Sequence, residues 1–153
     1  MLVSLIISTY NRPDALLLVL YSVERQSKFV NEVIIADDGS DKETKNAVLN
    51  FKKNSKLNIV YSWQEDKGFR AAESRNKAIA NSIGEYLILI DGDMILHHKF
   101  IEDHIKNAEK GFFIQGTRSL LTEKTTKNAI RSMKVNFFFL SKACLFTKIE
   151  LPL

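Results

Sequence analysis

Two aspartates separated by one glycine, Asp91 and Asp93 around Gly92, follow an apolar run at residues 86–90. A buried strand with this pattern would deliver both carboxylates at its carboxyl end, where open α/β sheets bind their ligands. Carboxylate oxygens suit Mg²⁺ or Mn²⁺, which usually keep part of their coordination shell for water and substrate phosphates. The pattern indicates a metal and phosphate site; the alternative is an ordinary Asp-Gly turn after a strand.

A second acidic cluster, residues 37–41, follows an earlier apolar run. An ionised aspartate only accepts hydrogen bonds, so Asp37 or Asp38 could accept from the N3–H of a uracil or from a ribose hydroxyl. The alternative is an Asp-Gly turn in which Ser40 or Asp41 caps the next helix. Because adjacent carboxylates repel one another and a turn needs only one, the pair is a candidate for nucleoside recognition.

A polar segment at residues 8–13 leads from a predicted strand into a predicted helix. Backbone N–H groups at a helix amino terminus, together with the guanidinium of Arg12, could bind phosphate or base oxygens. The alternative is plain capping of the helix by Thr9 or Asn11 ahead of Pro13. The segment is a second candidate for nucleotide binding.

Residues 64–76 form the fourth polar cluster. Gly68 would let the backbone approach a ligand, and Arg70 and Arg75 could bind a diphosphate from the helix that follows. The alternative is a solvated helix face on which the arginines pair with Glu73.

Alternating apolar runs and helical patterns supply the elements that would position these clusters. Strands are predicted at residues 3–7, 32–36, 58–62, 86–90 and 112–115, and helices from residue 13 onward, from 41 to about 53, and at about 69–82 and 99–108. This alternation predicts an α/β fold with a mostly parallel sheet flanked by helices. Since the carboxyl ends of parallel strands share one edge of a sheet, the four clusters are predicted to converge.

The spacing of apolar residues also predicts which side chains face the sheet. They are Leu16, Val19, Leu20 and Val23 in the first helix, Ala47, Val48 and Phe51 in the second, Ala72, Ala78 and Ile79 in the third, and Ile101 and Ile105 in the fourth. The histidines, His97, His98 and His104, are expected at the surface or at helix ends, and Cys144 is expected to be a buried thiol.

Composition limits the class of protein. The 153 residues fit one domain, with 45% hydrophobic and 26% charged residues. A net charge of +4 favours anionic partners such as nucleotides, phosphates or an acidic membrane surface. Nucleic acid is disfavoured because the basic residues are scattered and no nucleic-acid module is recognisable. A single cysteine and the absence of a basic leader before the short apolar start predict a cytoplasmic protein.

Residues 120–153 interleave basic side chains with aromatic ones. Their mixed periodicity predicts a helix followed by an irregular or strand segment. This tail could lie on an anionic membrane, at the inner face, as in a peripheral enzyme. The alternative is that its aromatic residues simply cover the sheet.

The four clusters, taken in order, resemble the nucleotide-binding half of family 2 glycosyltransferases, which have the Rossmann-like GT-A fold. The resemblance is carried by T-Y-N-R-P, D-D-G-S, G-F-R with S-R-N, and G-E-Y-L-I-L-I-D-G-D-M, and it covers residues 2–118. The Q-E-D-K-G-F-R stretch and the Asp-Gly-Asp-Met ending look similar to those of bacterial polysaccharide and lipopolysaccharide enzymes of this family, including chondroitin-polymerase-like ones. It implies a nucleotide-sugar-binding subdomain at residues 1–118 and the start of an acceptor-side region, apparently truncated, at 119–153.

The resemblance also assigns roles. The nucleotide-binding residues would be Ser8, Thr9, Tyr10, Asn11, Arg12, Asp37, Asp38, Gly68, Arg70, Arg75, Asp91 and Gly92. Among them Asp38 would read uracil, and Asp91 would contact the ribose or a metal-bound water. Asp93, with Asp91, would hold a divalent Mn or Mg ion that bridges the diphosphate.

The activity implied is that of an inverting hexosyltransferase, which moves a sugar from a UDP-sugar donor to a glycan or lipid-linked acceptor in cell-surface polysaccharide synthesis. Family members use an acidic pair on a later helix as general base. After Asp103 and Glu109 this chain has only Glu123 and Glu150, so no base is identified. The alternatives are a non-catalytic nucleotide-sugar-binding module and a nucleotidyltransferase, although the latter typically has a Gly-rich phosphate loop that residues 8–13 lack.

Overall fold

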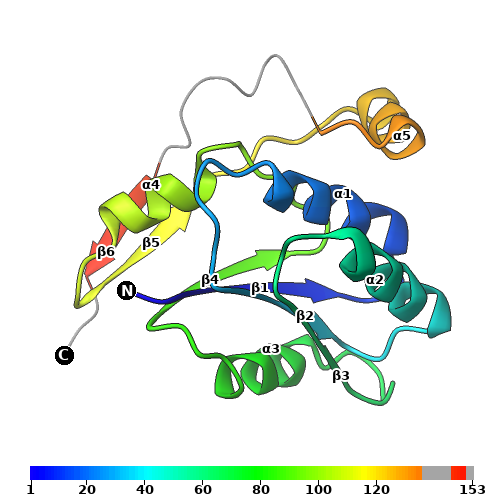
Figure 1. Ribbon diagram of the computed structural model, residues 1–153, viewed down its shortest axis with the longest axis horizontal. Helices are drawn as coiled ribbons and strands as arrows, with labels where there is room; N and C mark the ends of the chain where they lie inside the picture. Colours follow the sequence, from blue (N-terminus) through cyan, green and yellow to red (C-terminus); the bar gives the residue numbers. More distant parts are fainter. Residues whose placement is uncertain (136–145, 151–153) are drawn as a thin grey trace.

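The computed structural model describes residues 1–135 and the backbone of a strand at Phe146–Glu150. Four parallel strands form the central sheet in the order β3-β2-β1-β4 (Figure 1). Their bounds are β1 Val3–Thr9, β2 Glu32–Asp37, β3 Ile59–Trp63 and β4 Tyr86–Asp91. The helices are α1 Pro13–Glu24, α2 Lys42–Asn54, α3 Ala71–Ala80, α4 Phe100–Asn107 and α5 Glu123–Ser132. The predicted α/β fold is therefore confirmed.

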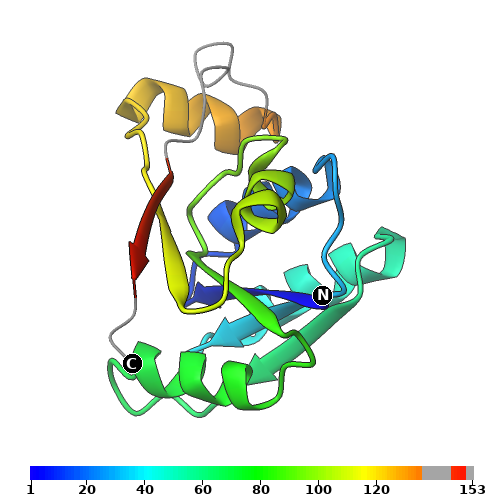
Figure 2. The same ribbon diagram turned by 90° about the vertical axis from the view of Figure 1, so that its left-hand side faces the viewer.

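Helices cover both faces of this sheet. Leu5, Ile7 and Val33 pack with α1 in the larger core cluster, whereas Ile6 and Ile34 pack under α3 in a smaller one. Neighbouring residues along a strand point to opposite faces, so uninterrupted apolar runs are what a sheet covered on both sides requires. Figure 2 shows α3 alone on one side of the sheet, with α1, α4 and α5 on the other.

The predicted inner faces are largely confirmed. All four residues of the α1 stripe are buried, as are Val48 and Phe51 in α2. Ala72 was predicted to face inward but is exposed, because α3 begins at Ala71 and turns Ser74 and Ala78 toward the sheet instead. His104 was expected at the surface or at a helix end, yet it lies within α4, is 5% exposed and shares a hydrogen bond of 2.9 Å with the hydroxyl of Tyr86.

The strand predicted at 112–115 does exist, but it lies outside the parallel sheet. It is β5, Phe112–Gly116, and it pairs antiparallel with β6, Phe146–Glu150, in a separate two-stranded sheet. The predicted helix in the tail is α5, and β6 is the strand segment expected beyond it. The expectations for Cys144 and for the aromatic residues of the tail at positions 137–139 concern residues outside the described ones. Within the described part, no helix has the length and apolar character to cross a bilayer.

The strand register brings the polar clusters together. Thr9 at the end of β1 lies beside Asp37 at the end of β2, and Ser8 lies beside Asp91 at the end of β4. Trp63, at the end of β3, lies beside Asp37 on its other side. The carboxyl ends of all four strands therefore meet at one edge, as the sequence predicts.

Candidate functional site

Asp38 is a buried carboxylate at this edge. Its side chain accepts hydrogen bonds from the backbone N–H of Arg70 at 2.7 Å and from Gln64 Nε2 at 2.7 Å. Each carboxylate oxygen can accept more than one hydrogen bond, so both retain capacity for a ligand donor. Gln64 directly follows β3 and belongs to the predicted polar cluster at residues 64–76, although that prediction gave it no role of its own.

Asp37 has a different environment from its neighbour. It is fully buried, and one oxygen accepts from the backbone N–H groups of Gly39 at 3.1 Å and Ser40 at 2.7 Å. Its other oxygen accepts from the hydroxyl of Tyr61, whose pKa is raised by burial and by this carboxylate. Asp37 therefore stabilises the loop between β2 and α2 by binding two of its backbone N–H groups.

Three segments hold one another at the sheet edge, and we call them the loop junction: residues 9–11, 38–41 and 64–70. Asn11 donates its backbone N–H to Ser40 Oγ at 2.8 Å and accepts from the N–H of Asp41 at 2.9 Å through its side chain. The hydroxyl of Tyr10 donates to Asp66 at 3.0 Å, which raises the Tyr10 pKa. A Cβ on Gly39 would lie 2.5 Å from the Cα of Asp66, and the φ of Gly39 is +98°, so this contact requires glycine.

Side-chain capping is present at the start of α2 and absent at the start of α1. Asp41 caps α2 by accepting from the N–H groups of Glu43 and Thr44, as predicted. Arg12 occupies the N-cap position of α1 without a side-chain cap, so neither Thr9 nor Asn11 acts as the cap there. Thr9 Oγ1 is instead buried with no hydrogen-bond partner among the described residues.

Arg75, Ser8 and Asp91 form a charged cluster between α3 and β4. The guanidinium of Arg75 donates to Ser8 Oγ from Nε at 3.2 Å and from its terminal nitrogen at 3.0 Å, and it forms an ion pair with Asp91 Oδ1. Ser8 Oγ also lies 3.2 Å from that oxygen. Arg75 therefore neutralises and orients Asp91, while no described residue is bonded to the second oxygen, Oδ2.

Asp93 contrasts with Asp91. The chain turns after β4, with the N–H of Gly92 donating to Ser8 O at 2.7 Å, and a Cβ on Gly92 would lie 2.7 Å from the same oxygen. Beyond this close approach the Asp93 side chain is exposed, with no hydrogen bond or ion pair to any described residue. Its carboxylate is available to an ion or ligand.

Arg70 and Gly68 lie in the loop junction. The Arg70 side chain pairs with Glu73 at 2.9 Å and donates to the carbonyl of Glu65, and its buried Nε has no partner among the described residues. The alternative that the arginines pair with Glu73 on a solvated helix face therefore holds for Arg70 in its ion pair with Glu73. Gly68 has a φ of +83° with open space beside it, and its N–H donates to Asp66 at 3.1 Å.

The described residues contain no group of three or more His, Cys, Asp or Glu side chains arranged to hold a metal ion. Mg²⁺ and similar hard ions are commonly held by one or two carboxylates together with waters and substrate phosphates. The unpartnered carboxylate of Asp93 and the second oxygen of Asp91 provide that donor set, so the residues present fit an ion that is completed by a diphosphate.

A four-stranded parallel sheet with acidic groups at the carboxyl ends of its strands is the architecture of GT-A enzymes, and comparison with solved structures bears this out. The mannosyltransferase PcManGT from Pyrobaculum calidifontis, solved with GDP-Man and Mn²⁺, superimposes with a TM-score of 0.63 at 20% identity, over 82% of this chain and 37% of that one. TarS from S. aureus gives 0.59 at 24% identity, over 69% and 32%, and has also been solved with UDP and with UDP-GlcNAc.

The chain belongs to glycosyl transferase family 2, whose family model matches residues 4–149. The hyaluronan synthase of Pasteurella multocida is 30% identical over 67% of this chain and 10% of its own length. The chondroitin synthase of Escherichia coli is 32% identical over 67% and 15%. An uncharacterised glycosyltransferase of Rickettsia felis is 32% identical over 89% and 22%. The chain thus spans less than a quarter of the length of these relatives.

Proposed function

We propose that this chain is the donor-binding part of an inverting hexosyltransferase, which moves a hexose from a UDP-sugar to a glycan or lipid-linked acceptor in cell-surface polysaccharide synthesis. The observation that carries the proposal is the convergence of the buried Asp38 with the Asp91 and Asp93 pair at one sheet edge of a family 2 fold. The relatives named as hyaluronan and chondroitin synthases and the TarS complexes with UDP and UDP-GlcNAc support the donor class.

In this proposal the loop junction receives the nucleoside. Asp38 accepts from uracil N3–H, and its bonds to Gln64 and Arg70 fix the orientation of the carboxylate before the base arrives. The exposed ring of Tyr10 is held beside this position by Asp66. The Thr9 hydroxyl, buried without a partner among the described residues, lies at the same sheet edge.

The diphosphate is assigned to the Asp91 and Asp93 side of the edge. Asp93 and Asp91 Oδ2 would hold Mn²⁺ or Mg²⁺, and the bound ion would neutralise charge on the departing nucleotide. Arg75 holds Asp91 in place through its ion pair, and the structures of relatives with Mn²⁺ support the choice of ion. Residues 1–118 then form the donor-binding part, and residues 119–153 begin the acceptor side.

Calorimetric titration with UDP, in Mn²⁺ and in chelator, tests the proposal. We expect Mn²⁺ to tighten binding, and Asp93→Asn to remove the metal effect while retaining the weaker binding seen in chelator. Asp103→Asn, which removes the same charge from the first turn of α4, is the matched control. Equal affinity in Mn²⁺ and chelator would refute the metal assignment, and absence of UDP binding under both conditions would refute the donor.

The place of action proposed is the cytoplasm, with peripheral contact at the inner face of the membrane. Exposed basic side chains on α5, such as Lys124 and Arg131, support contact with anionic lipid. Flotation with liposomes that contain or lack anionic lipid tests this contact, and failure to float with the anionic liposomes would refute it.

A further inference from the structure

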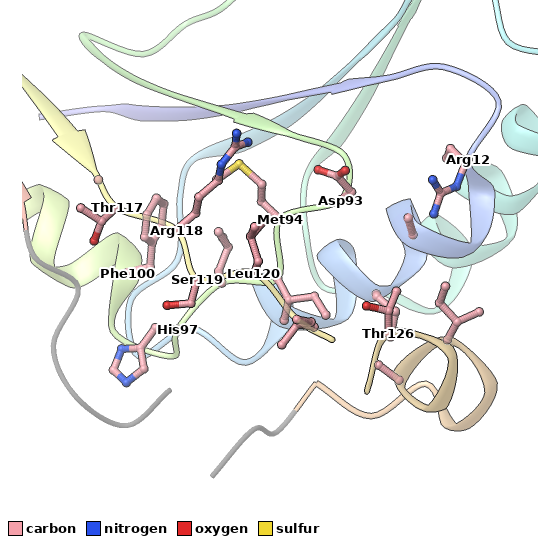
Figure 3. Close-up of a pocket in the computed structure, with 18 residues that line it drawn as sticks. Arg12, Asp93, Met94, His97, Phe100, Thr117, Arg118, Ser119, Leu120 and Thr126 are labelled. Atoms are coloured by element: carbon pink, nitrogen blue, oxygen red, sulfur yellow. The ribbon is translucent and has the colours of Figure 1, made fainter. Parts of the chain in front are cut away.

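A pocket of about 430 Å³ adjoins the proposed donor site on the α1 side of the sheet. It lies between the amino end of α1, the segment after β4, and the segment from β5 to α5 (Figure 3). Arg12 and Asp93 line it, so it shares a wall with the site described above. Its volume is within the range of about 300–1,000 Å³ that is typical of pockets for small organic ligands.

Much of the pocket wall is apolar. Leu18 and Leu96 are buried at its base, Phe100 and Ile130 contribute further hydrocarbon surface, and Leu120 is 89% exposed at its side. A hydroxyl-rich sugar placed against such a wall would lose hydrogen bonds to water without replacement. An apolar chain would instead remove both its own surface and that of Leu120 from water.

Two guanidinium groups, those of Arg118 and Arg12, line the pocket together with the carboxylate of Asp93. Arg118 is exposed, and it has no hydrogen bond or ion pair with any other described residue. Figure 3 shows it extending toward the side of the pocket where Met94 and Asp93 lie. Among the described residues, the Arg12 side chain forms one ion pair, with the half-exposed Asp14 at 3.3 Å. A planar guanidinium fork matches phosphate geometry, so the pocket complements an anionic head attached to an apolar chain.

We propose that this pocket binds the acceptor and that the acceptor is an amphiphile with a phosphate head and an apolar chain. The head lies at Arg118, and the chain lies against Leu18, Leu96 and Leu120. Naming the ligand as the acceptor rests on the proposed function, whereas its chemical class rests on the pocket alone.

Binding of three small probes to the chain of residues 1–153 tests the proposal by calorimetry, in chelator and with UDP at saturation to occupy the donor site. The probes are octyl phosphate, octyl glucoside and inorganic phosphate. Octyl phosphate is expected to bind at least tenfold more tightly than either of the others. Equal binding of octyl glucoside would overturn the anionic head, and equal binding of inorganic phosphate would overturn the apolar chain.

Two variants locate the binding. Arg118→Gln should weaken octyl phosphate roughly three- to tenfold and leave UDP affinity unchanged, since a partly exposed ion pair contributes modestly. Lys124→Gln, which removes an exposed charge outside the pocket, is the control. Ala15→Leu, which places hydrocarbon in the pocket from a helical position, should also weaken octyl phosphate.

Unchanged octyl phosphate binding in both pocket variants would overturn the location. The UDP titration of the unmodified chain separates the two proposals. If UDP binds and octyl phosphate does not, the acceptor inference fails alone; if UDP does not bind, the donor proposal fails, and the probe series in its absence still decides the chemistry of the pocket.

Discussion

Replacing Asp38 by asparagine keeps the shape of the side chain and removes its charge, which makes it a sharp test of base recognition. In the structure both carboxylate oxygens accept from donors, Gln64 Nε2 and the N–H of Arg70, each at 2.7 Å. Asparagine has one acceptor and one donor, so one of these N–H groups would face another N–H. A buried donor left unpaired costs about 1–3 kcal/mol of stability.

The expected loss of UDP affinity is larger than for a neutral contact. A hydrogen bond to a charged group contributes about 1.5–3 kcal/mol, which corresponds to roughly 12- to 160-fold in the dissociation constant. Calorimetry with UDP and with ADP measures it, and the preference of the unmodified chain for UDP should largely disappear in the variant. Near-ultraviolet circular dichroism checks that the variant remains folded.

Asp41→Asn is the matched control for this experiment. It removes a charge from the same loop, and asparagine caps a helix as well as aspartate does, so α2 keeps its start and UDP affinity should be unchanged. A folded Asp38→Asn variant that binds UDP within threefold of the unmodified chain would refute the role of Asp38. So would equal binding of UDP and ADP by the unmodified chain.

Three further outcomes concern stability. Gly92→Ala should lower the free energy of unfolding, measured by urea denaturation, by about 1–3 kcal/mol, because the added Cβ would lie 2.7 Å from Ser8 O. An unchanged free energy of unfolding would show that β1 and β4 can move apart there without cost. Burial lowers the pKa of His104 to about 4, so on acidification the unfolded chain takes up the proton before the folded one. The free energy of unfolding should therefore fall by about 1–2 kcal/mol from pH 7 to pH 5. His104→Leu should remove this pH dependence, and an unchanged pH dependence in the variant would contradict the assignment. Asp41→Ala should lower the melting temperature through loss of about 1 kcal/mol of capping, whereas Asp41→Asn should not.

Local sequence patterns predicted the elements of the fold because each depends on nearby residues. The stripe of α1 after Pro13 and the uninterrupted apolar run of β4 are visible in the sequence and appear in the structure with nearly the predicted bounds. The pairing of β5 was not predictable in this way. Its partner β6 begins 30 residues after β5 ends, and no local pattern specifies such a distant pairing.

The roles of individual residues were harder to predict from the sequence than their positions in the fold. The sequence places Asp37 and Asp38 together at a strand end, but only the fold shows that the first is enclosed by its own loop and Tyr61 while the second binds Gln64 and Arg70. In contrast, the burial of His104 could have been predicted from the helical spacing of the sequence. It lies three residues after Ile101, on the same helical face as that fully buried side chain.

The loop junction has a consequence for any attempt to change donor preference by exchanging loops. Asn11 bonds the segment after β2, Asp38 bonds the segment after β3, and Tyr10 reaches Asp66 across both. A foreign segment inserted alone would leave its two neighbours without their partners and would meet Gly39 where no added atom fits. The three segments therefore form a single transplantable unit, although more than fifty residues separate the first from the last. Exchange between relatives should succeed when all three are moved together.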